Sequence, residues 1–450
     1  MGRRLVNTLK AVLLLLGKVL SWLLGIVAIA VAVFWFSVPD LAIGSLYLLA
    51  GIAFLPPVTR LLKKRLKEWL AGLIRLGIAA SGIAAALYLT QFNANRYYAR
   101  GSEQFNQGQY RAAIATYDVA LNYVPFNLTK VSLSRGDAAL KLNRYQAAVE
   151  DYSKAIAFEP ENGTAYFKRG TAYQRVGRYV EATDDYGKAI AYGYRNADIH
   201  IQRGNAYLKN GDYWNAVSDY DKALELDPDR KQIYSKRGQA HVETADYETA
   251  IADLDRAIEL NPRDRNAYLH RGIARLNLEK LQPAIEDLGK AIELAPGEKA
   301  YFYRAEAYNY RDNYQNAIAD YTKAIELNRN QFAFYAQRGF VYNMAGQYQP
   351  AIADSTKAIE LDPDDPGPYN NRGFARNWIG QNQQAIRDYD KAIKLDPEFA
   401  IAYNNRGMAR SDVGDYAGAM KDLNRAAELA KQQGDMESYH MIQETTRALR

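Results

Sequence analysis

The sequence contains no cysteine, and only four of its 450 residues are histidine. Without cysteine the chain forms no disulfide, thiolate nucleophile or cysteine-ligated metal site, and the redox state of its compartment stays undetermined. No two histidines (His200, His241, His270 and His440) lie at metal-ligand spacing. A glycine-rich phosphate loop, a Gly-x-Ser-x-Gly nucleophile elbow and the kinase motif set are missing as well. We therefore expect no enzyme, no cofactor and no metal.

The net positive charge of the chain comes entirely from its N-terminal segment. The 57 basic and 51 acidic residues give a net charge of +6. Residues 1–93 hold ten basic and two acidic residues, a net charge of +8, so the remainder of the chain carries −2. Because the basic excess lies beside apolar runs, membrane topology explains it better than nucleic acid does. We expect no nucleic-acid partner.

Three apolar runs occupy this segment. Val19–Val38 has no charged residue and is long enough to span a hydrocarbon core of about 30 Å. It is too long for the apolar core of a signal peptide, about 7–15 residues, so we interpret it as a retained anchor. The second run, Leu41–Leu55, is short for a crossing and is either tilted or re-entrant. The third, Leu70–Thr90, contains Arg75 as its only charge. Residues 1–93 are therefore predicted to be a membrane anchor with two to three transmembrane helices.

The basic residues predict the orientation of this multi-pass anchor. Arg3, Arg4 and Lys10 place the N-terminus in the cytoplasm, and the cluster from Arg60 to Arg75 places the second loop there. With three crossings the rest of the chain is extracytoplasmic, which we favour. With two crossings it is cytoplasmic.

Beyond residue 93 one pattern returns ten times. Its marker is an arginine followed by glycine (once by alanine), and it recurs every 33 to 35 residues. A period of 34 is the length of one helix–turn–helix repeat. The marker arginines are Arg100, Arg135, Arg169, Arg203, Arg237, Arg271, Arg304, Arg338, Arg372 and Arg406.

Residues 196–229 illustrate one unit. A first helix with an apolar face ends at Gly211, which supplies the backbone conformation that a helix C-terminus needs. The second helix carries Ala216 and Ala223 on one apolar stripe. Pro228 then ends it, because proline cannot continue the hydrogen-bond ladder.

This pattern resembles the tetratricopeptide repeat family from Asn95 to about Lys431. The shared features are the glycine at the eighth position, the turn Gly-x-Tyr, the paired alanines and the terminal proline. Tyr194 and Arg329 replace that proline, and residues 279–281 replace the usual turn, so we expect these junctions to be looser or repacked.

The resemblance implies an all-α protein in which transmembrane helices precede a right-handed α-solenoid. Residues 94–431 would form about ten helix hairpins. Residues 432–450 would form a capping helix, because a stacked array needs a solvating end.

A second series accompanies the marker arginines. Nine of the ten are followed, sixteen residues later, by aspartate. The series either pairs each arginine with its aspartate across the hairpin or leaves the arginines free as an anion-binding stripe, and a matched series favours pairing. The aspartates are Asp151, Asp185, Asp219, Asp253, Asp287, Asp320, Asp354, Asp388 and Asp422.

By resemblance to the family, the binding surface is the concave groove formed by the first helices. Its inward-facing positions in the last three units hold asparagines, whose amides both donate and accept hydrogen bonds and suit a peptide backbone. Aromatic and methionine side chains beside them supply apolar contact. The alternative role is packing between units. The residues are Phe340, Asn343, Met344, Asn370, Asn371, Phe374, Asn377, Trp378, Asn404, Asn405 and Met408. His200 and His241 fall where other units have tyrosine, so we expect both to be packed in the core.

The function predicted from these features is a membrane-tethered scaffold that binds partner proteins or peptides. An assembly or maturation factor for a membrane protein complex is the alternative, and only the partner separates the two. A transporter or channel component would need polar intramembrane residues beyond Arg75. The partner and the oligomeric state are left open.

Overall fold

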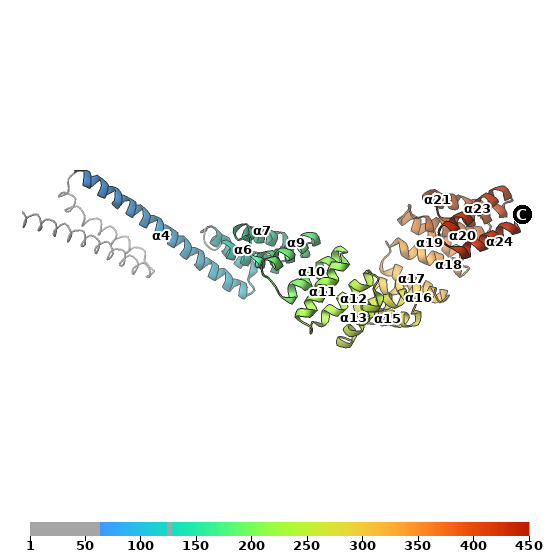
Figure 1. The fold of residues 1–450 in the computed structure, drawn as a ribbon, viewed down its shortest axis with the longest axis horizontal. Helices are drawn as coiled ribbons and strands as arrows, with labels where there is room; N and C mark the ends of the chain where they lie inside the picture. Colours follow the sequence, from blue (N-terminus) through green and yellow to red (C-terminus); the bar gives the residue numbers. More distant parts are fainter. Residues whose placement is uncertain (1–63, 124–127, 450) are drawn as a thin grey trace, which may run out of the picture. The chain divides into compact units, whose positions relative to one another are not determined.

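The computed structural model describes residues 64–123 and 128–449. This part of the chain contains 21 helices and no strand (Figure 1). The predicted all-α class is confirmed. The apolar runs at residues 19–38 and 41–55 lie outside the described residues, so their predicted crossings stay predictions.

The first described helix, α4 (Lys64–Asn106), contains the third apolar run and continues without interruption through residue 93. Its segment Ile74–Asn106 is long and apolar enough to cross a membrane, and no other helix among the described residues meets that description. Large apolar side chains on it are exposed, with Leu76 at 68% and Ile83 at 62%. By its contacts the chain divides into two units, Met1–Ala99 with Val119–Phe126, and Arg100–Asp118 with Asn127–Arg450.

The second of these units is a row of helix hairpins (Figure 1). In each hairpin the two helices pack on each other, and the second helix also packs on the first helix of the following hairpin. The pairs are α6 (Leu128–Lys141) with α7 (Tyr145–Phe158), α8 (Gly163–Arg175) with α9 (Tyr179–Ala191), α10 (Ala197–Asn210) with α11 (Tyr213–Leu226), α12 (Lys231–Glu243) with α13 (Tyr247–Leu260), α14 (Arg265–Asn277) with α15 (Leu281–Leu294), α16 (Glu298–Asn309) with α17 (Tyr314–Leu327), α18 (Phe332–Met344) with α19 (Tyr348–Leu361), α20 (Pro366–Trp378) with α21 (Asn382–Leu395), and α22 (Ala400–Asp412) with α23 (Tyr416–Gln432). The array predicted from the 34-residue period is confirmed.

Both ends of the row are occupied by helices. At its start, the last residues of α4 pair with α5 (Tyr110–Leu121), where Thr116 Oγ1 donates to Gln104 Oε1 at 2.6 Å. At its end, α24 (Met436–Ala448) packs on α23 and buries Ile442 and Thr446. The predicted C-terminal capping helix is therefore present.

Small residues bring the two helices of each hairpin together. The marker glycine of the first helix lies against the residue sixteen positions later, which is a fully buried tyrosine or leucine in most units. A Cβ atom on Gly238 would lie 2.6 Å from Leu254 Cγ and 3.3 Å from the carbonyl oxygen of Ala250. The first distance is too short for two non-bonded carbon atoms, so glycine at this position allows the close approach of the helices.

We expect Gly238→Ala to lower the free energy of unfolding by about 1.5 kcal/mol, because an added methyl group overpacks a filled core. Gly187, in the middle of α9, is the matched control. Its Cβ would meet only the Arg203 guanidinium, at 3.8 Å. Gly187→Ala should stabilise the protein by about 0.5–1 kcal/mol through helix propensity. Thermal unfolding of both variants checks the pair, and a change of the same sign in both would contradict this packing.

The turn inside each hairpin places one residue in the left-handed conformation. Six units use glycine there, whereas four use Asn143, Ala245, Glu279 and Asp312, with φ between 56° and 61°. Residues 279–281 therefore differ from the other turns in residue type only, because their backbone adopts the same turn conformation. Of the two junctions without the terminal proline, the one at Tyr194 is repacked, because its ring stacks on Phe167 with a centroid separation of 4.5 Å. The looser or repacked junction expected at Arg329 stays a prediction.

We expect Glu279→Gly to stabilise the protein by about 1 kcal/mol, since a side chain in the left-handed region costs about 1–2 kcal/mol that glycine avoids. Glu286→Gly, the same replacement on the exposed face of α15, should instead cost about 1 kcal/mol. Chemical denaturation of the two variants gives the comparison. Destabilisation by Glu279→Gly would show that the turn is held by other means.

The arginine and aspartate series form the predicted pairs in all nine units. In the third unit, Arg169 Nε and Nη2 donate to the two carboxylate oxygens of Asp185 at 2.7 and 2.9 Å. The aspartate side chain is 4% exposed and the arginine 17%. The guanidinium group also lies 5.5 Å from the ring centroid of Tyr166. Because all nine arginines already have counter-charges, they form a structural network, and an anion-binding stripe of these residues is excluded.

The third nitrogen of the same arginines links consecutive units. Nη1 donates to a side chain of the preceding second helix at seven positions, for example from Arg338 to Thr322 at 2.8 Å. The acceptors are Asp118, Ser153, Asp221, Asp255, Thr322, Thr356 and Asp390. Arg203 and Arg304 face Gly187 and Gly289 at the equivalent positions. Within the described chain, the junctions between α9 and α10 and between α15 and α16 therefore lack this link.

Candidate peptide-binding groove

The groove residues predicted from the sequence lie on three neighbouring first helices, α18, α20 and α22. Helix α20 packs between the other two, in contact with both. The 34-residue period therefore places equivalent positions of these helices side by side.

The apolar members of the set form an exposed stripe. Trp378 is 61% exposed, Met344 49%, Met408 40% and Phe340 38%. Phe374 is half-buried and lies 6.0 Å from Trp378 between ring centroids. The indole of Trp378 also stacks on the ring of Tyr348, with 5.6 Å between ring centroids. We call Phe340, Met344, Phe374, Trp378 and Met408 the apolar stripe. It offers apolar side chains that are partly exposed, among them a Trp378 ring that its neighbours hold in place.

Most of the asparagines connect the helices to one another. The buried Asn343 donates through Nδ2 to the carbonyl oxygen of Asn371 at 2.8 Å. Asn405 donates to Oδ1 of the buried Asn370 at 3.0 Å. Asn377 donates to Asp412 at 3.0 Å. These three amides therefore serve packing between units, which was the alternative to peptide binding in the sequence analysis.

Two asparagine side chains differ from the rest. Asn371 and Asn404 are half-buried, and their side-chain amides make no hydrogen bond with the residues that the structure describes. Oδ1 of Asn377, beside Trp378, is buried without a partner in the same part of the chain. The free amides of Asn371 and Asn404 are the polar groups from which the groove can hold a peptide backbone, whereas Asn377 Oδ1 is too buried to meet one.

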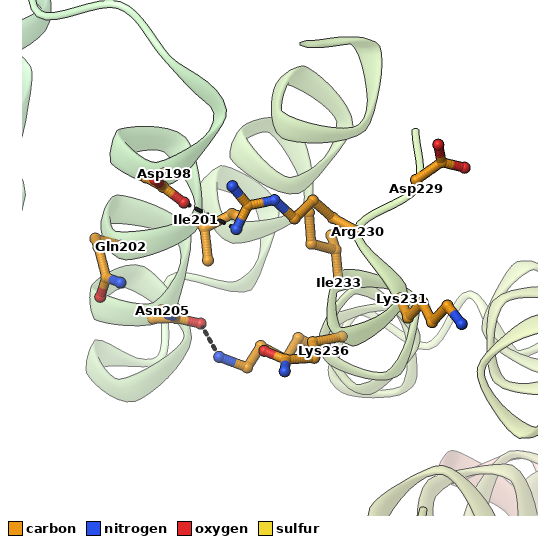
Figure 2. A pocket seen from close by; sticks show the side chains of 10 residues that line it. Asp198, Ile201, Gln202, Asn205, Asp229, Arg230, Lys231, Ile233 and Lys236 are labelled. Atoms are coloured by element: carbon orange, nitrogen blue, oxygen red, sulfur yellow. Dashed lines mark hydrogen bonds and ion pairs between the residues drawn. The ribbon is translucent and has the colours of Figure 1, made fainter. Parts of the chain in front are cut away.

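A hollow that the sequence analysis missed lies between α10 and α12, the first helices of the fourth and fifth units. The pocket has a volume of about 360 Å³. Its lining comes largely from the positions that face the groove in the last three units. Asp198, Ile201, Gln202, Asn205, Asp229, Arg230, Lys231, Gln232, Ile233 and Lys236 line it (Figure 2).

Two polar pairs close opposite sides of this pocket (Figure 2). Arg230 Nη1 lies 3.0 Å from Asp198 Oδ1 on one side. On the other side Lys236 Nζ donates to Asn205 Oδ1 at 2.7 Å. The pattern of residue types held a signal for this site, because a lysine at the sixth position of one unit faces an asparagine at the ninth position of the unit before.

Three of the four histidines are packed into the array, whereas His440 is exposed. His200 and His241, predicted to be core residues, have side chains that are 12% exposed. Nδ1 of His200 lies 2.9 Å from Asp219 Oδ1. His270 occupies the repeat position of Asn371 and Asn405, which were predicted to face the groove, but it is 8% exposed. That position therefore differs from unit to unit, depending on how closely the neighbouring first helices approach.

Family models match the repeats along the chain. Models described as tetratricopeptide repeat match residues 197–230, 235–300, 298–331, 332–365 and 400–433, and one described as TPR repeat matches residues 136–177 and 379–414. The chain belongs to the tetratricopeptide repeat family. Stacked repeats of this kind expose long concave surfaces that bind proteins and peptides.

Several individual proteins resemble parts of this chain. Sperm-associated antigen 1 of Rattus norvegicus is 35% identical over 78 residues, which is 17% of this chain and 8% of that protein. The crystal structure of YrrB, described as a TPR protein with an unusual peptide-binding site, is 22% identical, with a TM-score of 0.38, over 41% of this chain and 95% of YrrB. Yeast Tom70 is 16% identical, with a TM-score of 0.38, over 80% of this chain and 92% of Tom70. The family assignment rests on the sequence models.

Proposed function

We propose that this tetratricopeptide repeat protein is a membrane-tethered scaffold that binds extended peptide segments of partner proteins along its first helices. Its domains would be an anchor at residues 1–93, the array at 94–431 and a cap at 432–450. The exposed apolar stripe of the last three units is the observation that carries the proposal. Single apolar residues on a surface are ordinary, but five on adjacent helices are typical of an interaction site.

The stripe favours peptides with large apolar side chains. Trp378 and Phe374 give flat apolar contacts, and Met344 and Met408 adapt to the shape of what they touch. The free amides of Asn371 and Asn404 would bond the peptide backbone, which carries one donor and one acceptor at most residues.

Selection of phage-displayed peptides on the full-length chain in detergent tests this function. We expect enrichment of peptides with an aromatic or aliphatic anchor, and at least a tenfold loss of affinity (about 1.4 kcal/mol) for Trp378→Ala. Trp214→Ala is the matched control, because Trp214 is 72% exposed on the second helix α11. A selected peptide that binds Trp378→Ala as well as wild type would overturn the proposal for this groove.

Because the chain has no cysteine, labelling of single introduced cysteines can test which side of the membrane carries the repeats. A membrane-impermeant maleimide is applied to two variants, Asp40→Cys and Lys421→Cys, each of which has a single thiol. Three crossings predict that both are labelled from outside the cell, whereas two crossings predict labelling of Asp40→Cys alone. Absence of outside labelling at Asp40→Cys would contradict both topologies.

An assembly or maturation factor for a membrane complex would use the same groove and differ in its partner. Cross-linking in membranes followed by mass spectrometry separates these roles. Capture of subunits before they assemble indicates the assembly factor, and capture of finished complexes indicates the scaffold.

A further inference from the structure

The pocket between α10 and α12 contains a cation without a counter-charge. Lys236 bonds Asn205, and no carboxylate among the described residues pairs with it. Two units earlier, the equivalent Lys168 donates to both carboxylate oxygens of Asp137, each at 2.6 Å. Asp137 and Asn205 occupy the same repeat position. The chain therefore neutralises one lysine internally and leaves the other with a neutral partner.

The environment of Lys236 favours an added negative charge. Burial lowers the pKa of this lysine, and the nearby positive charge of Lys209 lowers it further. Both effects disfavour the ammonium ion as it stands, and an anion beside it would offset them.

The other charges around the pocket are balanced or point elsewhere. The Arg230 guanidinium is held by Asp198 and by Asp227, the latter at 2.6 Å from Nε. Figure 2 shows the side chains of Asp229 and Lys231 pointing away from the other lining residues. The unbalanced charge inside is therefore that of Lys236. Amide side chains on the lining add hydrogen-bond donors.

From this geometry we infer that the pocket binds the side-chain carboxylate of an acidic residue in an extended peptide lying along the first helices. The inference rests on the proposed function and adds a charged recognition point in the fourth and fifth units. The incoming carboxylate supplies to Lys236 the negative charge that Asp137 supplies to Lys168, and it accepts charge-assisted hydrogen bonds from Lys236. A polyanion such as nucleic acid is disfavoured, because the chain after residue 93 carries a net charge of −2.

The test uses the full-length chain in detergent and two fluorescent twelve-residue peptides, one alternating glutamate with serine and the other glutamine with serine. Fluorescence anisotropy at low salt should show at least a tenfold preference (about 1.4 kcal/mol) of the wild type for the glutamate peptide. Asn205→Asp should abolish most of that preference, because the new aspartate supplies the missing carboxylate from within the chain. Lys236→Gln should do the same by removing the cation.

Lys168→Gln is the matched control and should leave the preference unchanged within about twofold, since Lys168 is already paired. The basic residues of segment 1–93 are the same in all variants, so differences between variants report on the pocket. Circular dichroism checks that each variant keeps its helices.

A glutamate preference that survives in both Asn205→Asp and Lys236→Gln would overturn the inference. Equal loss in Lys168→Gln would also overturn it, as would displacement of the glutamate peptide by inorganic phosphate at low millimolar concentration, which would indicate a site for a free anion. The peptide selected for Trp378-dependent binding separates the two proposals. If that peptide binds the wild type, but the wild type does not prefer the glutamate peptide to the glutamine peptide, this inference alone fails. If neither the selected peptide nor the glutamate peptide binds, both proposals fail.

Discussion

Replacement of Asp253 by asparagine is expected to lower the free energy of unfolding by about 3 kcal/mol. The Asp253 side chain is 7% exposed and accepts from Arg237 Nε and Nη2 at 2.7 and 2.6 Å. Asparagine has nearly the same shape, but it removes the negative charge and turns an N–H group toward the guanidinium. The arginine would then stay charged and half-buried without its main counter-charge.

Asp221 provides the control within the same network. It accepts from Nη1 of the same arginine at 2.6 Å, but its side chain is 50% exposed. Asp221→Asn should cost less than about 1 kcal/mol, because water replaces most of what the charge loses. Hydrogen exchange of the α12 and α13 amides measures both variants locally, which suits an array whose units unfold separately. Equal protection in the two variants would count against a structural role for the buried pairs.

A double replacement separates charge pairing from packing. Changing Arg237 to methionine and Asp253 to leucine removes both charges and keeps apolar volume. We expect this variant to recover most of the stability lost in Asp253→Asn, because a buried ion pair gives little net stability over apolar residues of similar size.

His270→Gln is expected to protect the protein from acid, with a gain over wild type of about 2 kcal/mol at pH 4.5 and little change at pH 7.5. Burial lowers the pKa of His270 to about 4, and the positive charge of Lys299 acts in the same direction. Asp264 opposes this shift and Arg265 adds to it. In the unfolded chain the pKa is about 6.5.

The sign follows from where the proton binds. Between pH 6.5 and 4 the unfolded chain takes up a proton that the folded chain resists, so the stability of the wild type falls as the pH is lowered through this window. Above it, histidine is neutral in both states. Glutamine is the natural choice, because Gln202 and Gln337 occupy the same repeat position. Urea midpoints at pH 7.5 and 4.5 give the comparison, and a pH-independent difference between the two proteins would refute the assignment.

The repeat was readable from the sequence because each unit solves the same packing problem with the same residues. The marker glycines and the paired alanines recur where helices approach closely, and Gly238 against Leu254 shows why small residues are favoured there. The pairing of Arg169 with Asp185 was also predictable. A sixteen-residue separation that returns in nine units requires a contact that the fold repeats.

Departures from the repeat were not readable in the same way. Glu279 adopts the left-handed turn conformation although its residue type does not favour it. The stacking of neighbouring units imposes that backbone, and the strain is local. Likewise, the hydrogen bond from Arg338 Nη1 to Thr322 joins two consecutive units. Only the stacked arrangement shows which acceptor such an arginine reaches.

By itself, the sequence determined the helical class, the number of units and the ion pairs within hairpins. It also determined the apolar character of the first helices in the last three units. All of these depend on residues within one period, where the helix geometry sets which side chains meet. The tertiary structure decided which groove side chains are free, since Asn343 and Asn405 are used between units whereas Asn371 is not. It also decided that His270 is buried and that Lys236 borders a pocket, because exposure depends on how closely consecutive first helices approach.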